Sequence, residues 1–408
     1  MYRPFEMNRD FEDVRKVWME SGWLTDSPAQ TKALKVFLDD TFGVVAHIKN
    51  SVEVLASARM GTLLYDRTDL PLASVSSVNV GRVARGLGLG GSATAQVVSE
   101  AARRGAAVAI LGMFEQGYYD KLGFGSGVQQ RHMTFDPGAL KVPRLTRPPI
   151  RLTATDHQRI HANRLSRLRR HGAPSFNDAS VTKSDMLFDE ASFGLGFEDD
   201  SGRLTHHLWM LTKGENGPYR IQWMAYETFD QLIELLSVVA SLKDQINGVR
   251  FSEIPGIQLQ DLIDHPLTHH RITRQGEYAQ KHFSLAWWQA RICDLSACIG
   301  AVSIHGPAIK FRLNLTDPIE DRLPVDSPWR GVAGQYDINL AICSTVSKAT
   351  DPTLPILNAS VGALSRLWLG VQDASGLSAT DDLCGPSDLL SALDRQLRLP
   401  KPVVDWDL

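Results

Sequence analysis

Features that would place a protein in a membrane, outside the cell or on nucleic acid are scarce in this sequence. It contains no run of about 18 apolar residues, so no membrane-spanning helix is expected. The first residues also lack the apolar core of a secretory leader. The formal net charge is -3, which gives no support to a nucleic-acid-binding protein. We therefore expect a cytoplasmic protein without membrane or nucleic-acid partners.

Cysteine is also rare. The four cysteines lie in the last third of the chain and lack the paired spacing of a metal site: Cys293, Cys298, Cys343 and Cys384. This pattern is typical of free thiols in a reducing compartment, and we expect no metal cofactor. The chain of 408 residues is too long for one ordinary domain, so two or three domains are expected.

The most informative stretch runs from Val80 to Ser92, where an apolar strand passes through a glycine turn into a helix. Residues without a Cβ let a phosphate approach the main chain, and successive N–H groups can point toward it. The start of the following helix adds free N–H groups and the positive end of the helix dipole. We therefore predict a pyrophosphate-binding loop of Arg85, Gly86, Leu87, Gly88, Leu89, Gly90 and Gly91.

Two other interpretations fit the same glycines. Residues 86–91 match the dinucleotide fingerprint G-x-G-x-x-G, which belongs after the first strand of a βαβ unit. Here a predicted hairpin (44–49 and 52–58) and a further strand (73–80) come before the loop, which disfavours that fingerprint. The turn could also serve only to pack a helix closely on a sheet. The order of elements favours binding of an acyl-coenzyme A over both.

Two motifs resemble a known superfamily. Residues 80–90 carry V-x-x-x-x-R-G-x-G-x-G, which resembles the acetyl-CoA motif of the GNAT N-acetyltransferases, with Arg82 where that motif commonly has proline. Residues 115–125, E-Q-G-Y-Y-D-K-L-G-F-G, are similar to a segment of the Eis (enhanced intracellular survival) family of aminoglycoside acetyltransferases. Residues 287–292 and the C-terminus also resemble that family. The resemblance spans the whole chain and is weakest in its middle.

The resemblance implies a fold that is both α/β and α+β, with tandem GNAT folds. Residues 1–145 would form the N-terminal, acetyl-CoA-binding catalytic domain. Residues 146–283 would form a central, degenerate GNAT fold, because no arginine-glycine loop occurs there. Residues 284–408 would form a sterol-carrier-protein-like α+β domain that ends in a catalytic tail.

A helix predicted after Thr155 is rich in arginine. We interpret its basic side chains as a solvated or intersubunit surface: Arg159, Arg164, Arg167, Arg169 and Arg170.

Acyl transfer from a thioester to an amine needs a held donor, a polarised carbonyl, a base, and an acid for the leaving thiolate. Val78 and Val80 lie where a splayed strand can offer main-chain groups to the pantetheine arm and the thioester; their side chains can be simple core valines. Tyr119 lies in a short helix expected around residues 116–121. Its flanks match the Eis segment, so it is the candidate general acid. A phenol has an ordinary pKa of about 10 and stays protonated at neutral pH. The adjacent Tyr118 is expected only to pack.

No acidic residue stands out as a base on the strand before the loop. The resemblance implies that the base is the C-terminal carboxylate, here that of Leu408. Two prolines stiffen the tail, and valines and Trp406 can anchor it, so we expect it to dock rather than to be disordered. An α-carboxylate has an ordinary pKa of about 3.3–3.7. Partial burial would therefore have to raise that pKa, or the group would accept a proton through water.

A desolvated cationic acceptor is expected to be met by carboxylates. Asp26 and Asp407 match acidic positions of the Eis acceptor site, although Asp26 can also be a helix-start residue. Trp23 and Trp406 are candidate aromatic walls or, equally, core residues. The resemblance thus implies an acetyl-CoA-dependent N-acetyltransferase of primary amines, such as aminoglycosides at several positions, assembled as a hexamer. Protein-lysine or polyamine acetylation and a non-catalytic lipid-binding function are the alternatives.

Overall fold

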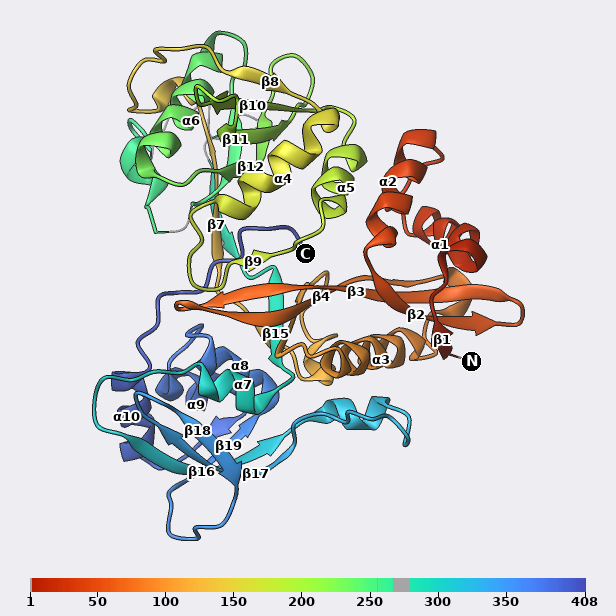
Figure 1. The fold of residues 1–408 in the computed structure, drawn as a ribbon, viewed down its shortest axis with the longest axis vertical. Coiled ribbons are helices and arrows are strands. Elements are labelled where there is room, and N and C mark those ends of the chain that lie inside the picture. The colour runs from red at the N-terminus through yellow and green to blue at the C-terminus, as the bar shows by residue number, and fades with distance from the viewer. Residues whose placement is uncertain (1, 255, 267–278, 280) are drawn as a thin grey trace.

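The computed structural model describes residues 2–254, 256–266, 279 and 281–408, and the strands in these residues form three sheets (Figure 1). In the first sheet, the short strand β9 (Pro174–Ser175) pairs with the end of β3 (Ser51–Tyr65). Its main strands are, in spatial order, β1 (Tyr2–Pro4), β2 (Phe42–Ile48), β3 (Ser51–Tyr65), β4 (Thr68–Val80), β5 (Val108–Gly112), β15 (Trp288–Ile292) and β6 (Gly125–Ser126).

Helices cover both faces of the first sheet: α1 (Met7–Glu20) and α2 (Pro28–Asp39) on one, α3 (Leu89–Arg103) on the other (Figure 1). Alternation along β3 explains this arrangement. Val54 and Ala56 pack in the apolar cluster with α3, whereas Leu55 packs with α1 and α2. Successive strand residues point to opposite faces, so β3 is apolar on both sides.

The second and third sheets lie above and below the first in Figure 1. The second contains, in spatial order, β14 (Lys281–Leu285), β7 (Gln130–Phe135), β13 (Val249–Ser252), β12 (Tyr219–Ala225), β11 (Leu204–Leu211), β10 (Ser192–Glu198) and β8 (Ile150–Leu152). Around it lie α4 (His157–Ser166), α5 (Ser180–Phe188) and α6 (Phe229–Ser241).

The third sheet is formed by the C-terminal part of the chain. It contains β18 (Thr345–Lys348), β17 (Gly334–Leu340), β16 (Ile309–Thr316), β19 (Ile356–Ser360) and β20 (Leu383–Cys384). The same part of the chain holds α7 (Leu295–Gly300), α8 (Val361–Trp368), α9 (Ala374–Thr380) and α10 (Ser387–Gln396).

β7 and β15 each pair in a sheet that is formed mainly by another of the three segments predicted from the sequence. β7 comes from the first segment but pairs with β13 and β14 in the second sheet. β15 comes from the third segment but lies between β5 and β6 in the first sheet, with all five residues buried. The arrangement is mixed α/β, and the division into three domains at residues 145 and 283 stays a prediction.

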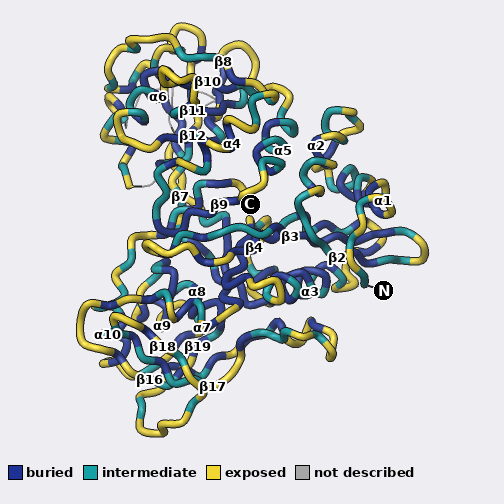
Figure 2. Tube along the Cα trace, viewed as in Figure 1, coloured by how far each residue is buried: buried dark blue, intermediate teal, exposed yellow. Residues whose placement is uncertain are grey.

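Buried residues concentrate where the sheets meet (Figure 2). One apolar cluster joins β3, β15, the third sheet and the C-terminal tail. Within it, Tyr65 stacks on Trp368 with ring centroids 4.5 Å apart, and the Tyr65 hydroxyl donates a hydrogen bond to the Trp368 carbonyl. Among the described residues, no helix has both the length and the apolar character that a membrane span requires.

Candidate active site

The first sheet opens between β4 and β5. Residues 72–75 of β4 pair in parallel with residues 108–111 of β5. Beyond these residues the two strands separate, while β4 stays paired with β3 and β5 stays paired with β15. A bulge on β4 accompanies this divergence, and its Ser77 has a φ of 53°, in the left-handed region. Strain of this kind and bulges are typical of functional sites. Val78 and Val80, whose main-chain groups were predicted to face the thioester, lie on the diverging part of β4.

The predicted pyrophosphate loop leads from this divergence into α3. Gly86 and Gly88 have φ values of 80° and 72°, which favour glycine. Gly88 is the N-cap of α3, and no side chain in the described structure caps the first N–H groups of the helix. A Cβ added at Gly86 or Gly91 would meet no heavy atom within 4 Å. Uncapped N–H groups beside open space fit a phosphate-bearing ligand.

Two arginines lie beside this loop. Arg85 is exposed, as its place in the motif suggested. Arg322 belongs to a short 3-10 helix at Pro318–Arg322, and its Nη1 lies 3.8 Å from the position that a Cβ on Gly88 would occupy. Sequence reasoning missed Arg322 because it lies in a different predicted domain, and no local pattern connects it with the glycines.

The corresponding helix of the second sheet differs at its N-terminus. α6 begins with a capping box, in which the Thr228 hydroxyl accepts a hydrogen bond from the Gln231 N–H and the Gln231 side chain accepts one from the Thr228 N–H, both at 3.3 Å. These N–H groups already have partners within the chain. α6 therefore presents fewer free N–H groups than α3 does.

The short helix expected around residues 116–121 is a 3-10 helix at Asp120–Leu122, and Tyr119 lies in the turn before it. Its side chain is 3% exposed and packs edge-on against Tyr118, with ring centroids 4.9 Å apart. Burial raises the pKa of Tyr119 above its ordinary value. The phenol is thus protonated at neutral pH, as a general acid must be.

Arg291 on β15 holds this turn in place. Its guanidinium donates a hydrogen bond to the Leu122 carbonyl and forms an ion pair with Asp317 at 2.6 Å, with both charged groups fully buried. Gln289, also on β15, donates to Asp120 Oδ1 at 2.6 Å. The inserted strand therefore fixes the turn that carries Tyr119.

Tyr118 packs against the start of α3. A Cβ added at Gly90 would lie 2.7 Å from the Tyr118 hydroxyl and 2.9 Å from Val80 Cγ2, so the phenol lies against the first turn of α3. Burial raises its pKa, while the charge of Arg322 lowers it. Two adjacent phenols therefore lie near the predicted phosphate loop, and the family pattern had pointed only to Tyr119.

The C-terminal tail is docked, and the prediction of an ordered tail is confirmed. Val404 and Trp406 are 3% and 2% exposed. Asp405 forms a two-pronged ion pair with Arg167, at 2.6 and 2.8 Å. Leu408 packs at the edge of the apolar cluster that holds Trp406. The role of the Leu408 carboxylate as base stays a prediction.

The expectation of a solvated arginine surface is wrong for Arg164 and Arg167, which are 2% and 7% exposed. The Arg164 guanidinium lies between the rings of Trp223 and Trp406, at 4.3 and 3.8 Å from their centroids, and pairs with Asp185 at 2.9 Å. Ion pairing and stacking offset the cost of burying these cations. Sequence periodicity alone could not reveal partners on a sheet and on the distant tail.

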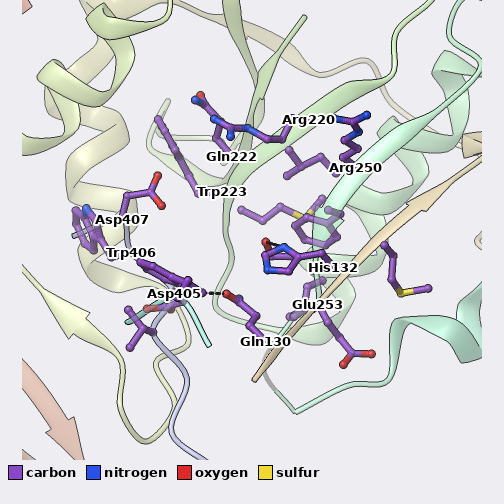
Figure 3. A pocket seen from close by; sticks show the side chains of 18 of the residues that line it. Gln130, His132, Arg220, Gln222, Trp223, Arg250, Glu253, Asp405, Trp406 and Asp407 are labelled. Atoms are coloured by element: carbon purple, nitrogen blue, oxygen red, sulfur yellow. Dashed lines mark hydrogen bonds between the residues drawn. The ribbon is translucent and has the colours of Figure 1, made fainter. Parts of the chain in front are cut away.

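A cavity of about 460 Å³ lies between the tail and the second sheet (Figure 3). Trp406 and Asp407, two of the predicted acceptor residues, both line it. Asp407 is accessible to solvent, yet the enclosing walls raise its pKa by desolvation, against the opposing charges of Arg164 and Arg220. Tyr119 is not among the residues that line this cavity.

The other two predicted acceptor residues lie in the connection between α1 and α2. Trp23 is 46% exposed and packs edge-on against Trp18, with ring centroids 5.3 Å apart. Asp26 is exposed and pairs with Arg15 at 3.2 Å. Neither residue lines the cavity beside the tail. Within the described ranges, no group of three or more His, Cys, Asp or Glu side chains could hold a metal ion.

Comparison with solved structures identifies the fold as that of the GCN5-related N-acetyltransferases. A probable N-acyltransferase of unknown function from Enterococcus faecalis V583 superimposes with a TM-score of 0.80 at 15% identity, over 100% of this chain and 99% of that chain. A GCN5-related N-acetyltransferase from Kribbella flavida gives 0.73 at 18% identity, covering 100% and 98%. Eis1 from Mycobacterium abscessus gives 0.76 at 14% identity, covering 100% of both chains. No protein-family model and no curated protein matches the sequence.

Proposed function

We propose that this protein is an acetyl-CoA-dependent N-acetyltransferase that acts on primary amines. The observation that carries the proposal is the junction of β4 with α3. There, diverging strands lead to uncapped helix N–H groups, with Arg85 and Arg322 beside them and two phenols nearby. The shared fold of N-acetyltransferases supports the same activity.

Acetyl-CoA, when bound, supplies an acetyl group activated as a thioester. In this proposal the loop at residues 85–91 binds the diphosphate, and the main chain of Val78 and Val80 orients the pantetheine arm and polarises the carbonyl. The acceptor nitrogen attacks the carbonyl carbon, the C–N bond forms and the C–S bond breaks. The Leu408 carboxylate takes the proton from nitrogen, and Tyr119 gives its phenolic proton to the departing sulfur.

Acceptor selection is assigned to the tail. A cationic amine would bind near the Asp407 carboxylate, for which no ion pair occurs in the described structure, with Trp406 beside it. Aminoglycosides acetylated at several positions are the acceptors that the family resemblance favours, with lysine-containing peptides and polyamines as alternatives. The hexameric assembly implied by the same resemblance belongs to this proposal.

The decisive experiment measures cofactor binding and turnover separately. Calorimetry should show that the purified protein binds coenzyme A. With at least one amine present, the rate of thiol release from acetyl-CoA should exceed the rate of acetyl-CoA hydrolysis without an amine. The panel would contain an aminoglycoside, spermidine and a lysine-containing peptide, with mass spectrometry of each product. A folded protein that neither binds coenzyme A nor acetylates any of these amines would contradict the proposal.

A further inference from the structure

The second sheet opens in the same way as the first. β12 and β13 pair in parallel only at Tyr219 with Val249 and at Arg220 with Arg250. Beyond that pair β12 stays with β11 and β13 with β7, and the cavity of about 460 Å³ lies where the two strands diverge. A capping box begins α6 and residues 226–230 contain no glycine, so no loop like that at residues 85–91 leads into this helix. The proposed acetyl transfer gives the β12–β13 side of the cavity no role.

Two arginines face each other in register at the start of this opening. Arg220 and Arg250 are the last paired residues before the strands diverge, and both line the cavity. Like charges directly opposite on neighbouring strands are destabilising. Among the described residues, Arg250 has no ion pair. Arg220, whose side chain is 55% exposed, pairs with Asp189 at 3.9 Å, and its charge also acts on Asp407. A bound anion would give Arg250 a partner and Arg220 a further one.

The other cations of the cavity are already compensated. Arg164 is paired with Asp185, and Arg167 is paired with Asp405. In Figure 3, Arg220 and Arg250 lie along one edge of the cavity, while Trp406 and Asp407 lie along another. The Asp407 carboxylate repels an anion at the tail, so an acidic ligand group is directed to the two arginines.

The walls between these charges are largely apolar. Trp223, Met133 and Phe251 line the cavity, and Phe283 stacks on His132 with ring centroids 4.8 Å apart. Two lining side chains have buried polar atoms without a partner in the described residues: Gln222 Oε1 and His132 Nε2. A cavity of this size, with aromatic walls and a few polar atoms, suits a small organic ligand.

We propose that this cavity binds a small amphipathic acid, whose carboxylate lies between Arg220 and Arg250 and whose apolar body lies against Trp223 and Phe251. The site is independent of the cofactor loop on α3, so it stands even if the proposed acetyl transfer fails. The ligand is an apolar or aromatic monocarboxylate; a neutral or cationic molecule of the same shape leaves the arginine pair uncompensated.

The test compares matched acids and amides on the full-length protein. Binding of indole-3-acetate, phenylacetate and hexanoate, and of the amide of each, is measured by calorimetry. At least one acid should bind roughly tenfold or more tightly than its amide, as expected for loss of charge-assisted hydrogen bonds.

Variants locate the acid group. Arg220→Gln and Arg250→Gln should each weaken binding of that acid by roughly tenfold. Arg203→Gln, in the exposed turn between β10 and β11, is the matched control and should leave it unchanged. Thermal unfolding, measured in all three variants, reports whether they are folded. The proposal is overturned if no acid binds, if the amides bind equally, or if both cavity variants bind as the wild type does.

Discussion

Tyr118 and Tyr119 are neighbours in the sequence, yet their side chains have different surroundings. Tyr119 is enclosed by aromatic rings, including Phe114 and Phe124 at 5.7 and 6.1 Å between centroids. The Tyr118 hydroxyl lies against the first turn of α3. Only one of the two is required as the acid, and a matched pair of variants separates them.

Tyr119→Phe should lower kcat by roughly 100-fold or more, because general acid catalysis contributes about 10²–10⁴-fold. The dissociation constant of coenzyme A should stay unchanged, since the ring is retained. Tyr118→Phe should affect cofactor binding more than kcat. Steady-state kinetics and calorimetry on both variants provide the measurement, and a normal kcat for Tyr119→Phe would remove its assignment as acid.

His207 on β11 is a fully buried, neutral imidazole. Its Nε2 accepts a hydrogen bond from Trp223 Nε1 at 2.9 Å, so the ring proton lies on Nδ1, which donates to Asn163 Oδ1 at 2.6 Å. Burial, assisted by the nearby charge of Arg164, lowers the pKa of His207 to about 3. The unfolded chain would titrate near an ordinary histidine pKa of about 6.5.

This difference predicts a loss of stability in acid. Between pH 6.5 and pH 3 the unfolded state binds a proton that folded His207 does not, so the free energy of unfolding falls as the pH falls. The effect reaches about 2 kcal/mol at pH 5. In urea titrations at pH 7 and pH 5, His207→Gln should be less stable at pH 7 but lose less on acidification. Equal losses in the variant and the wild type would exclude His207 as the titrating group.

Among the structural elements, α3 depends on close contact at its first turn. In Gly90→Ala the added Cβ would collide with the Tyr118 hydroxyl and with Val80, so the loop must shift. Coenzyme A affinity should fall on the order of tenfold through weakened hydrogen bonds to the phosphates. Gly300→Ala in α7, where a Cβ meets no heavy atom within 4 Å, is the control for calorimetry. Unchanged affinity of the Gly90 variant would argue against this loop as the phosphate site.

The tail is the second element on which the proposed chemistry depends. A few residues added after Leu408 would move the terminal carboxylate while leaving Trp406 and the Asp405–Arg167 pair in place. Turnover should then drop far more than coenzyme A affinity. Leu408→Ala keeps a carboxylate at the same chain length and should retain most of the activity. Full turnover by the extended protein would reject the terminal base.

For the whole molecule, what the sequence could predict depends on how local each feature is. The glycine loop and α3 were predictable because turn chemistry acts over a few residues. The short helix expected around residues 116–121 is confined to a 3-10 helix at Asp120–Leu122, and Gly117, with a φ of 96°, is a reason for the turn before it. The burial of Arg164 and the approach of Arg322 to Gly88 depend on segments far away in the chain. Local patterns carry no signal for such contacts.

Strand exchange predicts that the first segment does not fold alone. Residues 1–145 lack β15, which lies between β5 and β6 and contributes Arg291 to the turn that carries Tyr119. Expressed by itself, this fragment should show no cooperative thermal unfolding and no binding of coenzyme A. Co-expression with residues 146–408 should restore both. A monomeric, coenzyme-binding fragment 1–145 would show that β15 is dispensable.

The same inserted strand constrains synthesis on the ribosome. β5 ends at Gly112, but its partner is complete only when Ile292 has been translated. At about 5–20 residues per second, the nascent chain carries an open strand edge for on the order of ten to forty seconds. An unpaired edge invites wrong pairing with other chains, so a chaperone that shields β5 during translation should raise the yield of native protein.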